Sequence, residues 1–229
     1  MLNYRDPAPC PQIGQMMEFA HRAFQATTVI FYWVNENTEM VDFQTQGVSS
    51  EFMDRYRAGM NHLDPLIVRR LAQNQRKVAL LHEEGADRPE SAAYIEFLRT
   101  YNIVDNLEFV FWNEGAPFAG LGVLRNIEDA PLDTMTMNVD AIQQYMEFNL
   151  LMHPHVREAR LQTTLANRFK LTHREIEVVS LLCGGSSNCD ISDVMGIGVA
   201  TVKTHVVNIL NKLGVDNRSS VVGLMMNLQ

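Results

Sequence analysis

Residues 171–214 constrain the fold more than any other stretch, because they encode three successive helices with clear starts and stops. Thr172 followed by Glu175 forms a capping box at the start of the first helix. Gly184 stops that helix, and Ser187 is a good N-cap for the second. Two short helices joined by a glycine-containing turn predict a helix-turn-helix.

The third predicted helix follows the turn Gly196, Ile197, Gly198 and has two different faces. One face is apolar with helical spacing, as a packed helix requires. The other carries short polar groups, an amide and a lysine, which suit base edges and phosphates in a major groove. An ordinary surface helix with a solvated face has the same periodicity, so periodicity alone leaves both interpretations open. The side chains that we predict to contact DNA are Ser187, Asn188, Thr201, Lys203, Thr204, Val207, Asn208 and Lys212.

The pattern of these residues resembles the LuxR-type DNA-binding domain, which is shared by quorum-sensing regulators and NarL-like response regulators. The resemblance covers roughly the last quarter of the chain and implies a DNA-binding domain. Two positions depart from the family pattern, because Cys189 stands where a basic residue is usual and Gly198 replaces a Ser or Thr cap. We expect both departures to weaken DNA affinity without changing the fold. The matching positions are Leu171, Thr172, Arg174, Glu175, Glu177, Val178, Gly185, Ser187, Asn188, Thr201, Val202, Lys203, His205, Asn208, Ile209, Lys212, Leu213, Val215 and Arg218.

A fourth helix is predicted over residues 218–228, and its apolar side chains recur at helical spacing. In the resembled family this helix pairs two domains on a palindromic site. We therefore expect a homodimer, and the alternative is that the stripe only packs against the first helix of its own domain. The stripe consists of Val221, Leu224, Met225 and Leu228.

Charge is distributed unevenly along the chain. From Ala166 onward there are six Lys and Arg against five Asp and Glu, a net charge of +1, which leaves −9 for the rest of a chain whose total is −8. The acidic N-terminal region is not expected to contact DNA, since phosphates would repel it. The C-terminal region is only weakly basic, so specific binding is expected to need two copies.

The cysteines and termini indicate a cytoplasmic protein. Cys10, Cys183 and Cys189 lack the spacing of a zinc site, and an odd number favours a reducing compartment. His153 and His155 have no neighbouring thiol or carboxylate, so we expect no metal. The chain has no signal-peptide pattern and no apolar run long enough for a membrane span, so no membrane partner is expected.

The N-terminal region combines strand and helix patterns, which predicts an α/β (α+β) fold with an antiparallel sheet between helices. Strands are expected at residues 27–34, 40–45, 78–81, 107–112 and 118–124. Helices are expected at residues 13–24, within 50–72, and at 89–101 and 134–152. The predicted organisation is a sensor-like domain at residues 1–152, a linker at 153–170 and an all-α, four-helix DNA-binding domain at 171–229.

Residues 50–125 resemble, less completely, the autoinducer-binding domain of LuxR proteins, through Phe52, Tyr56 and Asp64 before Pro65. In that family the aspartate bonds the amide of an acyl-homoserine lactone. The chain lacks a Trp around residues 78–82, and Asn106 replaces a usual Gly. We therefore expect a reshaped or filled cavity that binds these lactones weakly or not at all. The candidate ligand-binding residues are Trp33, Tyr56, Asp64 and Trp112.

These candidates have structural alternatives. Asp64 before Pro65 can simply cap a helix, and the two tryptophans in predicted strands can simply belong to the core. A small-molecule cavity is nevertheless compatible with a helix-covered sheet.

A transcription regulator is the leading functional interpretation, binding double-stranded DNA as a homodimer under the control of a small-molecule effector or a partner protein. The alternative is an orphan regulator without a ligand that acts through protein–protein contacts. A phosphorelay receiver is disfavoured because Asn35 and Glu36, with no acidic pair, follow the first predicted strand. The sequence has no nucleophile elbow, phosphate loop or paired carboxylates, so we expect neither an enzyme nor a cofactor.

Overall fold

The computed structural model describes residues 11–84, 89–132 and 137–228. The chain divides into two compact units, Met1–Leu150 and Leu151–Gln229. No helix among the described residues is long and apolar enough to cross a membrane.

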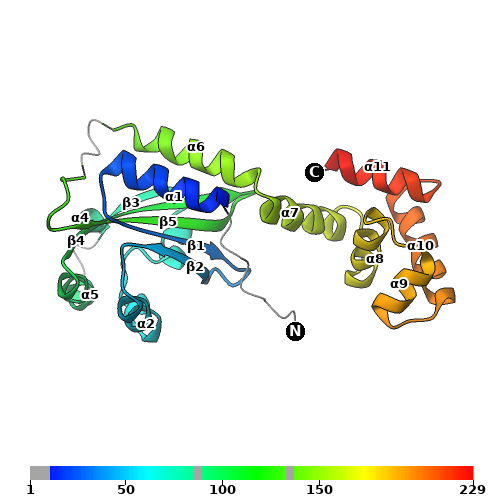
Figure 1. The fold of residues 1–229 in the computed structure, drawn as a ribbon, viewed down its shortest axis with the longest axis horizontal. Coiled ribbons are helices and arrows are strands. Elements are labelled where there is room, and N and C mark those ends of the chain that lie inside the picture. The colour runs from blue at the N-terminus through cyan, green and yellow to red at the C-terminus, as the bar shows by residue number, and fades with distance from the viewer. Residues whose placement is uncertain (1–10, 85–88, 133–136, 229) are drawn as a thin grey trace. The chain divides into compact units, whose positions relative to one another are not determined.

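The first unit contains a five-stranded antiparallel sheet with the strand order β2-β1-β5-β4-β3 (Figure 1). The predicted antiparallel sheet is thus confirmed, and each expected strand is present with small shifts at its ends. β-Branched and aromatic residues dominate β1 and β4, which favours strand over helix. The strands are β1 (Thr28–Val34), β2 (Met40–Gln46), β3 (Val78–Leu80), β4 (Ile103–Asn113) and β5 (Ala116–Asn126).

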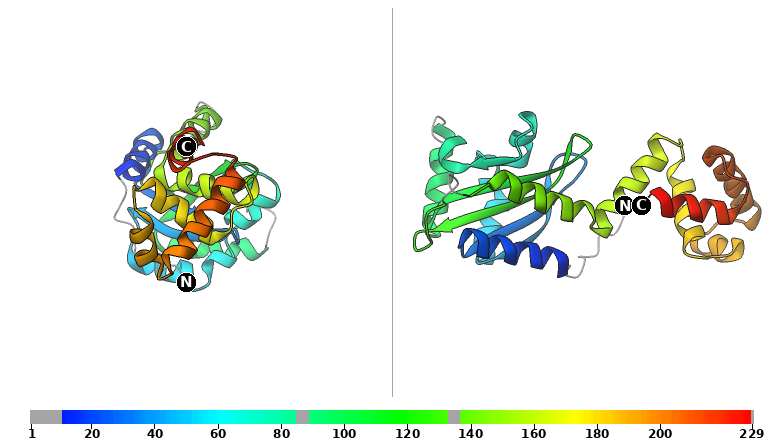
Figure 2. Two further views of the ribbon diagram at one scale, coloured as in Figure 1. Left: turned by 90° about the vertical axis from the view of Figure 1, so that its right-hand side faces the viewer. Right: turned by 90° about the horizontal axis from the view of Figure 1, so that it is seen from above.

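Both faces of the sheet are covered by helices, because the central strands are apolar on both sides. Helices α1 (Pro11–Phe24) and α6 (Val139–Leu151) lie along one face, whereas α2 (Ser50–Ala58) and α5 (Pro89–Thr100) lie on the other (Figures 1 and 2). The second face is also covered by α3 (Val68–Gln73). Short segments complete the unit as η1 (Met60–His62) and α4 (Leu81–Glu84).

Two helices of the first unit begin later than the sequence predicted. The helix expected from residue 134 begins at Val139, and residues 133–136 lie outside the described residues. Asp64 was expected to open a helix directly, but α3 begins only at Val68. The Asp64 carboxylate instead accepts a hydrogen bond from the Leu66 N–H at 2.8 Å, which forms a turn before the helix.

The second unit is all-α. The segment expected as a linker, residues 153–170, contains α7 (Pro154–Asn167), whose start is favoured by Pro154 in the first turn. Leu165 of α7 is buried in the core of this unit. The four helices predicted for this unit follow as α8 (His173–Cys183), α9 (Asn188–Met195), α10 (Val199–Leu213) and α11 (Arg218–Leu228).

Candidate DNA-binding and ligand-binding sites

Reciprocal capping bonds fix the starts of α8 and α9. The Glu175 carboxylate accepts a hydrogen bond from the Thr172 N–H at 2.7 Å, and the Thr172 hydroxyl accepts one from the Glu175 N–H at 3.3 Å. Ser187 and Asp190 repeat this arrangement at the start of α9. Because each cap satisfies backbone groups that a helix end leaves unpaired, the two helices have defined first residues.

The turn between α9 and α10 is fixed by Gly196, which has a left-handed φ of 63° that favours glycine. Its N–H and that of Ile197 both donate to the Ser192 carbonyl, and the Ser192 hydroxyl donates to the Ile197 carbonyl. Gly198 is the N-cap of α10 and, as expected from its lack of a side chain, makes no side-chain cap bond. The turn therefore holds α10 at a defined angle to α9.

Helix α10 separates a buried face from an exposed face. Val202 and Ile209 are fully buried in the core of the second unit. The exposed face includes Val207, whose 56% exposure is unusual for an aliphatic side chain. The predicted DNA-contacting residues of this helix are all exposed, namely Thr201, Lys203, Thr204, Val207, Asn208 and Lys212.

The predicted contacts of α9 and the end of α10 lie in different surroundings. Ser187 is exposed, and its oxygen accepts the capping bond from the Asp190 N–H. Asn188 is half-buried at the first position of α9. The Lys212 ammonium donates to the Glu175 carboxylate at 2.6 Å and to the Lys170 carbonyl at 3.0 Å, so it links α10 to the start of α8. Lys212 therefore has a structural role at the start of α8, and its predicted contact with DNA stays a prediction.

Helix α11 buries part of the apolar stripe that was expected to form the dimer contact. Val221 and Met225 are 0% and 2% exposed and pack in the core of their own unit, against α8, which is the alternative that the sequence left open. Leu224 and Leu228 are half-buried at the edge of that core. Arg218 docks the start of α11 by donating to the carbonyls of Leu182 and Ser186. Only the edge of the predicted stripe can therefore meet a second copy.

In the first unit, Tyr56 and Asp64 come together beneath the sheet, as the sequence predicted for ligand candidates. The Tyr56 hydroxyl donates to the Asp64 carboxylate at 2.8 Å, and both side chains are buried. They line a small cavity of about 30 Å³, room for about one water molecule. Burial raises the pKa of the Asp64 carboxyl, although its hydrogen bonds from Tyr56 and Leu66 oppose that shift.

The two tryptophans do not line this cavity. Side chains alternate between the two faces of β1, and Tyr32 lines the cavity. Trp33 and Phe31 point to the opposite face, where their ring centroids lie 5.0 Å apart. Trp33 therefore lies on the face covered by α1 and α6, and we remove it from the candidate ligand site.

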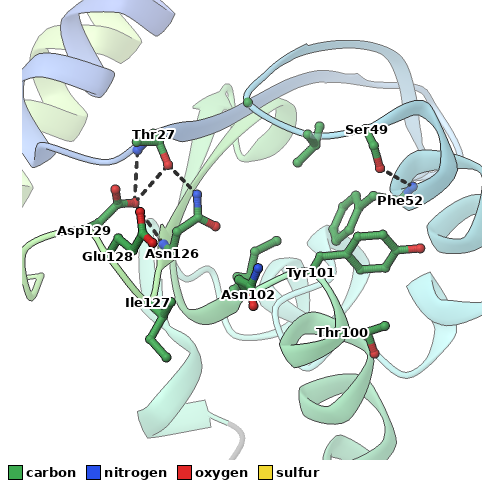
Figure 3. A pocket seen from close by; sticks show the side chains of 13 residues that line it. Thr27, Ser49, Phe52, Thr100, Tyr101, Asn102, Asn126, Ile127, Glu128 and Asp129 are labelled. Atoms are coloured by element: carbon green, nitrogen blue, oxygen red, sulfur yellow. Dashed lines mark hydrogen bonds between the residues drawn. The ribbon is translucent and has the colours of Figure 1, made fainter.

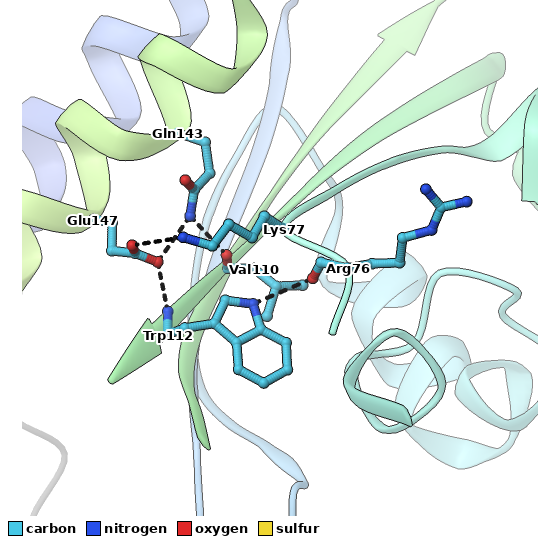
Figure 4. Close-up of polar contacts among 6 residues, drawn as sticks. All are labelled: Arg76, Lys77, Val110, Trp112, Gln143 and Glu147. Carbon is cyan, nitrogen blue, oxygen red and sulfur yellow. Dashed lines mark hydrogen bonds and ion pairs between the residues drawn. The ribbon is translucent and has the colours of Figure 1, made fainter. Parts of the chain in front are cut away.

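Trp112 is partly buried and packs against the hydrophobic core that contains Phe52 and Tyr56, but it does not line the cavity. Its indole N–H donates to the Arg76 carbonyl at 3.2 Å, and its backbone N–H donates to Glu147 of α6 at 2.7 Å (Figure 4). Glu147 also accepts bonds from Gln143 and Lys77 in this network (Figure 4). Trp112 thus joins β4 to neighbouring elements, and we remove it from the candidate ligand site as well.

Sequence reasoning missed the most polar residue of the cavity, Glu108 on β4. It is buried in the middle of a strand, accepts a hydrogen bond from the Tyr32 hydroxyl at 2.8 Å and accepts another from the Asn106 amide at 3.4 Å. Burial raises the pKa of Glu108 to about 8, and the nearby Asp64 carboxylate adds to the shift. The available signal was an acidic residue inside an otherwise apolar strand pattern.

A larger and more open pocket of about 470 Å³ lies at the end of the sheet (Figure 3). Its polar groups mainly bond one another: the Asp129 carboxylate accepts from the Thr27 N–H at 3.1 Å and from the Asn126 N–H at 2.9 Å (Figure 3). The Asn126 amide donates in turn to the Thr27 hydroxyl. Because the polar groups of this larger pocket are mainly paired with one another, the small cavity with Glu108 is the stronger candidate for binding a small molecule.

Comparisons with known proteins agree with the geometry of the second unit. Residues 170–225 match the family described as "Bacterial regulatory proteins, luxR family". The chain is 26% identical over 210 residues to the monoamine regulon transcriptional regulator of Klebsiella aerogenes, covering 92% of this chain and 88% of that relative. It is 41% identical over 75 residues to the response regulator protein VraR of Staphylococcus saprophyticus, but this match spans only 36% of VraR.

The fold is similar to that of a solved structure over both units. Escherichia coli SdiA has a TM-score of 0.50 and 15% sequence identity, with 92% of this chain and 87% of that chain covered. A second SdiA structure, in complex with octanoyl-rac-glycerol, has a TM-score of 0.50 at 14% identity. At this identity the likeness concerns the fold alone.

Proposed function

We propose that this chain, a transcriptional regulator whose C-terminal unit is a luxR-family helix-turn-helix domain, binds a palindromic operator as a dimer. The observation that carries the proposal is the exposed face of α10, where Thr201, Lys203, Thr204, Val207 and Asn208 project from a helix whose opposite side is buried. Such a helix fits a major groove, and its short side chains allow close approach to the bases.

Each side chain on this face suits a different part of a duplex. The Asn208 amide can bond an adenine edge at two atoms, and the exposed Val207 methyl groups suit contact with a thymine methyl. Lys203 supplies the cation for a phosphate or a guanine. The Thr204 hydroxyl donates to the Ala200 carbonyl at 3.1 Å, so it offers its oxygen and methyl rather than its proton.

Dimerisation is part of the proposal because one unit offers little positive charge to DNA. Lys212 is engaged by Glu175, and Lys203 is the only other lysine or arginine of α10. Two copies on a palindrome double the number of phosphate contacts and place two α10 helices in successive major grooves. We assign the contact between copies to Leu224 and Leu228 at the edge of α11.

We further propose that the first unit controls DNA binding in response to a small molecule. Buried polar groups beside a small cavity support this assignment. The small volume of the cavity, about 30 Å³, favours a second candidate, a regulator that answers to a partner protein instead. Ligand titrations of the full chain distinguish the two.

Replacing Lys203 with Ala is expected to weaken binding to an operator selected from random duplexes by about tenfold or more, the loss of one base or phosphate contact. Fluorescence anisotropy of the labelled duplex at several salt concentrations measures the effect. If Lys203 contacts a phosphate, the slope of log affinity against log salt also falls by about one.

The matched control is Lys212→Ala, because Lys212 lies on the same helix but bonds the nearly buried Glu175. Removing it is expected to lower the free energy of unfolding by about 2 kcal/mol, less than a fully buried pair would cost, since Lys212 is partly exposed. Unchanged affinity of Lys203→Ala at moderate salt would show that α10 does not read DNA with this face.

A further inference from the structure

The cavity between the sheet and α2 has an uneven balance of hydrogen-bond donors and acceptors. The Tyr32 hydroxyl and the Asn106 amide both donate to Glu108, and the Tyr56 hydroxyl donates to Asp64. Three side-chain donors that line the cavity are therefore directed at its two carboxyl groups.

One acceptor in this cavity has no partner. Asn106 is 4% exposed, and its side-chain oxygen Oδ1 is buried without a hydrogen-bond partner while the residue lines the cavity. Leaving a buried acceptor unpaired is unfavourable, so a ligand that donates a hydrogen bond to it gains affinity. This observation is independent of the carboxyl groups and points to a ligand with N–H or O–H donors.

The charge and the aromatic lining restrict the ligand further. No Lys, Arg or His among the described residues lines the cavity, although two carboxyl groups do. Aromatic rings surround these groups, with Phe43 at 6.4 Å and Tyr94 at 6.4 Å from the ring of Tyr56. Carboxylates and aromatic faces together favour a cation and disfavour phosphates, carboxylates and other anions.

The cavity is separated from a surface groove by only a few side chains. Met40, Phe43 and Tyr56 line both the cavity and an open groove of about 680 Å³. The Met40 sulfur lies 3.7 Å from the Tyr56 hydroxyl oxygen, whose proton is directed at Asp64. Because a methionine side chain changes rotamer at little cost, Met40 can move aside and admit a ligand from the groove.

We propose that this cavity binds the ammonium group of a small primary amine, with the carboxyl groups of Glu108 and Asp64 and the Asn106 Oδ1 atom as hydrogen-bond acceptors for its N–H groups. The carbon chain of the amine extends past Met40 into the groove. This assignment rests on the proposed function, in which the first unit senses a small molecule, and it names the chemical class of that molecule. The space beside Glu108 exists because position 122 is glycine: a Cβ there would lie 2.9 Å from the Glu108 carboxylate oxygen.

Thermal unfolding of the full chain with four probes tests the assignment. We expect n-butylammonium to raise the melting temperature of the first unit by roughly 5–10 °C at about 100 times its Kd. The uncharged n-butanol tests the need for charge, and n-butyltrimethylammonium, which has no N–H, tests the need for a donor. N-Butanoyl-homoserine lactone tests the neutral ligand class of the resembled family, and these three probes are expected to have no effect.

Two variants locate the site. Glu108→Gln keeps the shape of the side chain and its bond with Tyr32, and Asn106→Ala removes the unpaired oxygen. Each is expected to weaken n-butylammonium binding at least tenfold. A matched control is Asp129→Asn in the larger pocket, which should leave amine binding unchanged.

The outcomes separate the ligand from the function. An equal response to n-butanol, a stronger response to the lactone, or full amine binding by Glu108→Gln would overturn the amine assignment. No response to n-butylammonium would also overturn it, while operator binding by the same preparation would keep the proposed function. If the unmodified chain does not bind an operator, the proposed function is refuted, and the amine titration then tests only whether the cavity binds an amine.

Discussion

Replacing Met225 with Glu is expected to unfold the second unit rather than only to separate a dimer. Met225 is 2% exposed and packs among the apolar side chains of that unit. Deleting a buried methionine side chain alone costs roughly 2–5 kcal/mol, and a buried carboxylate without a partner adds its desolvation cost. The loss approaches the whole stability of a small domain, so helical circular dichroism and protease resistance of this unit should both fall.

Met226→Glu is the matched control, because the neighbouring side chain is 74% exposed and the same charge can remain in water. This variant should unfold at the temperature of the unmodified chain. Leu228→Glu, at the half-buried edge of α11, should reduce the cooperativity of operator binding if the copies meet there. A folded Met225→Glu variant would contradict the position of this side chain in the core.

The second unit could be predicted closely from its sequence because its signals are local. The starts of α8 and α9 depend on caps within three residues, formed by Thr172 with Glu175 and by Ser187 with Asp190. Each buried face depends on spacing within a helix. The long-range contacts were less predictable, because the ion pair that joins Lys212 to Glu175 connects residues far apart in sequence.

The first unit was predictable as a layered fold but not as a site. Alternation along β1 makes Tyr32 and Trp33 point to opposite faces, yet the sequence alone cannot tell which face holds the cavity when both are apolar. The aromatic Trp33 was therefore a natural but unsuitable candidate. Glu108 and Asn106 meet Tyr32 only through the pairing of β1 and β4 with β5, which sequence spacing does not reveal.

The stability of the first unit is expected to fall as the pH rises from 5 to 8 because of Glu108. Its pKa in the folded state is about 8, above the ordinary value of 4.5, so the folded state binds more protons than the unfolded state between these values. Stability must then decrease with pH across this window. A pKa difference of this size corresponds to a loss of about 3 kcal/mol between pH 5 and pH 8.

Urea unfolding followed by tryptophan fluorescence measures this loss in the first unit alone, because both tryptophans, Trp33 and Trp112, lie in it. Glu108→Gln cannot ionise and still accepts the bond from Tyr32, so most of the decrease should disappear in that variant. Asp64, Tyr56 and Tyr94 face the same cavity, and the raised pKa of Asp64 contributes a dependence of the same sign. An equally steep decrease in Glu108→Gln would mean that another group titrates, and that Glu108 is ionised in the folded protein at neutral pH.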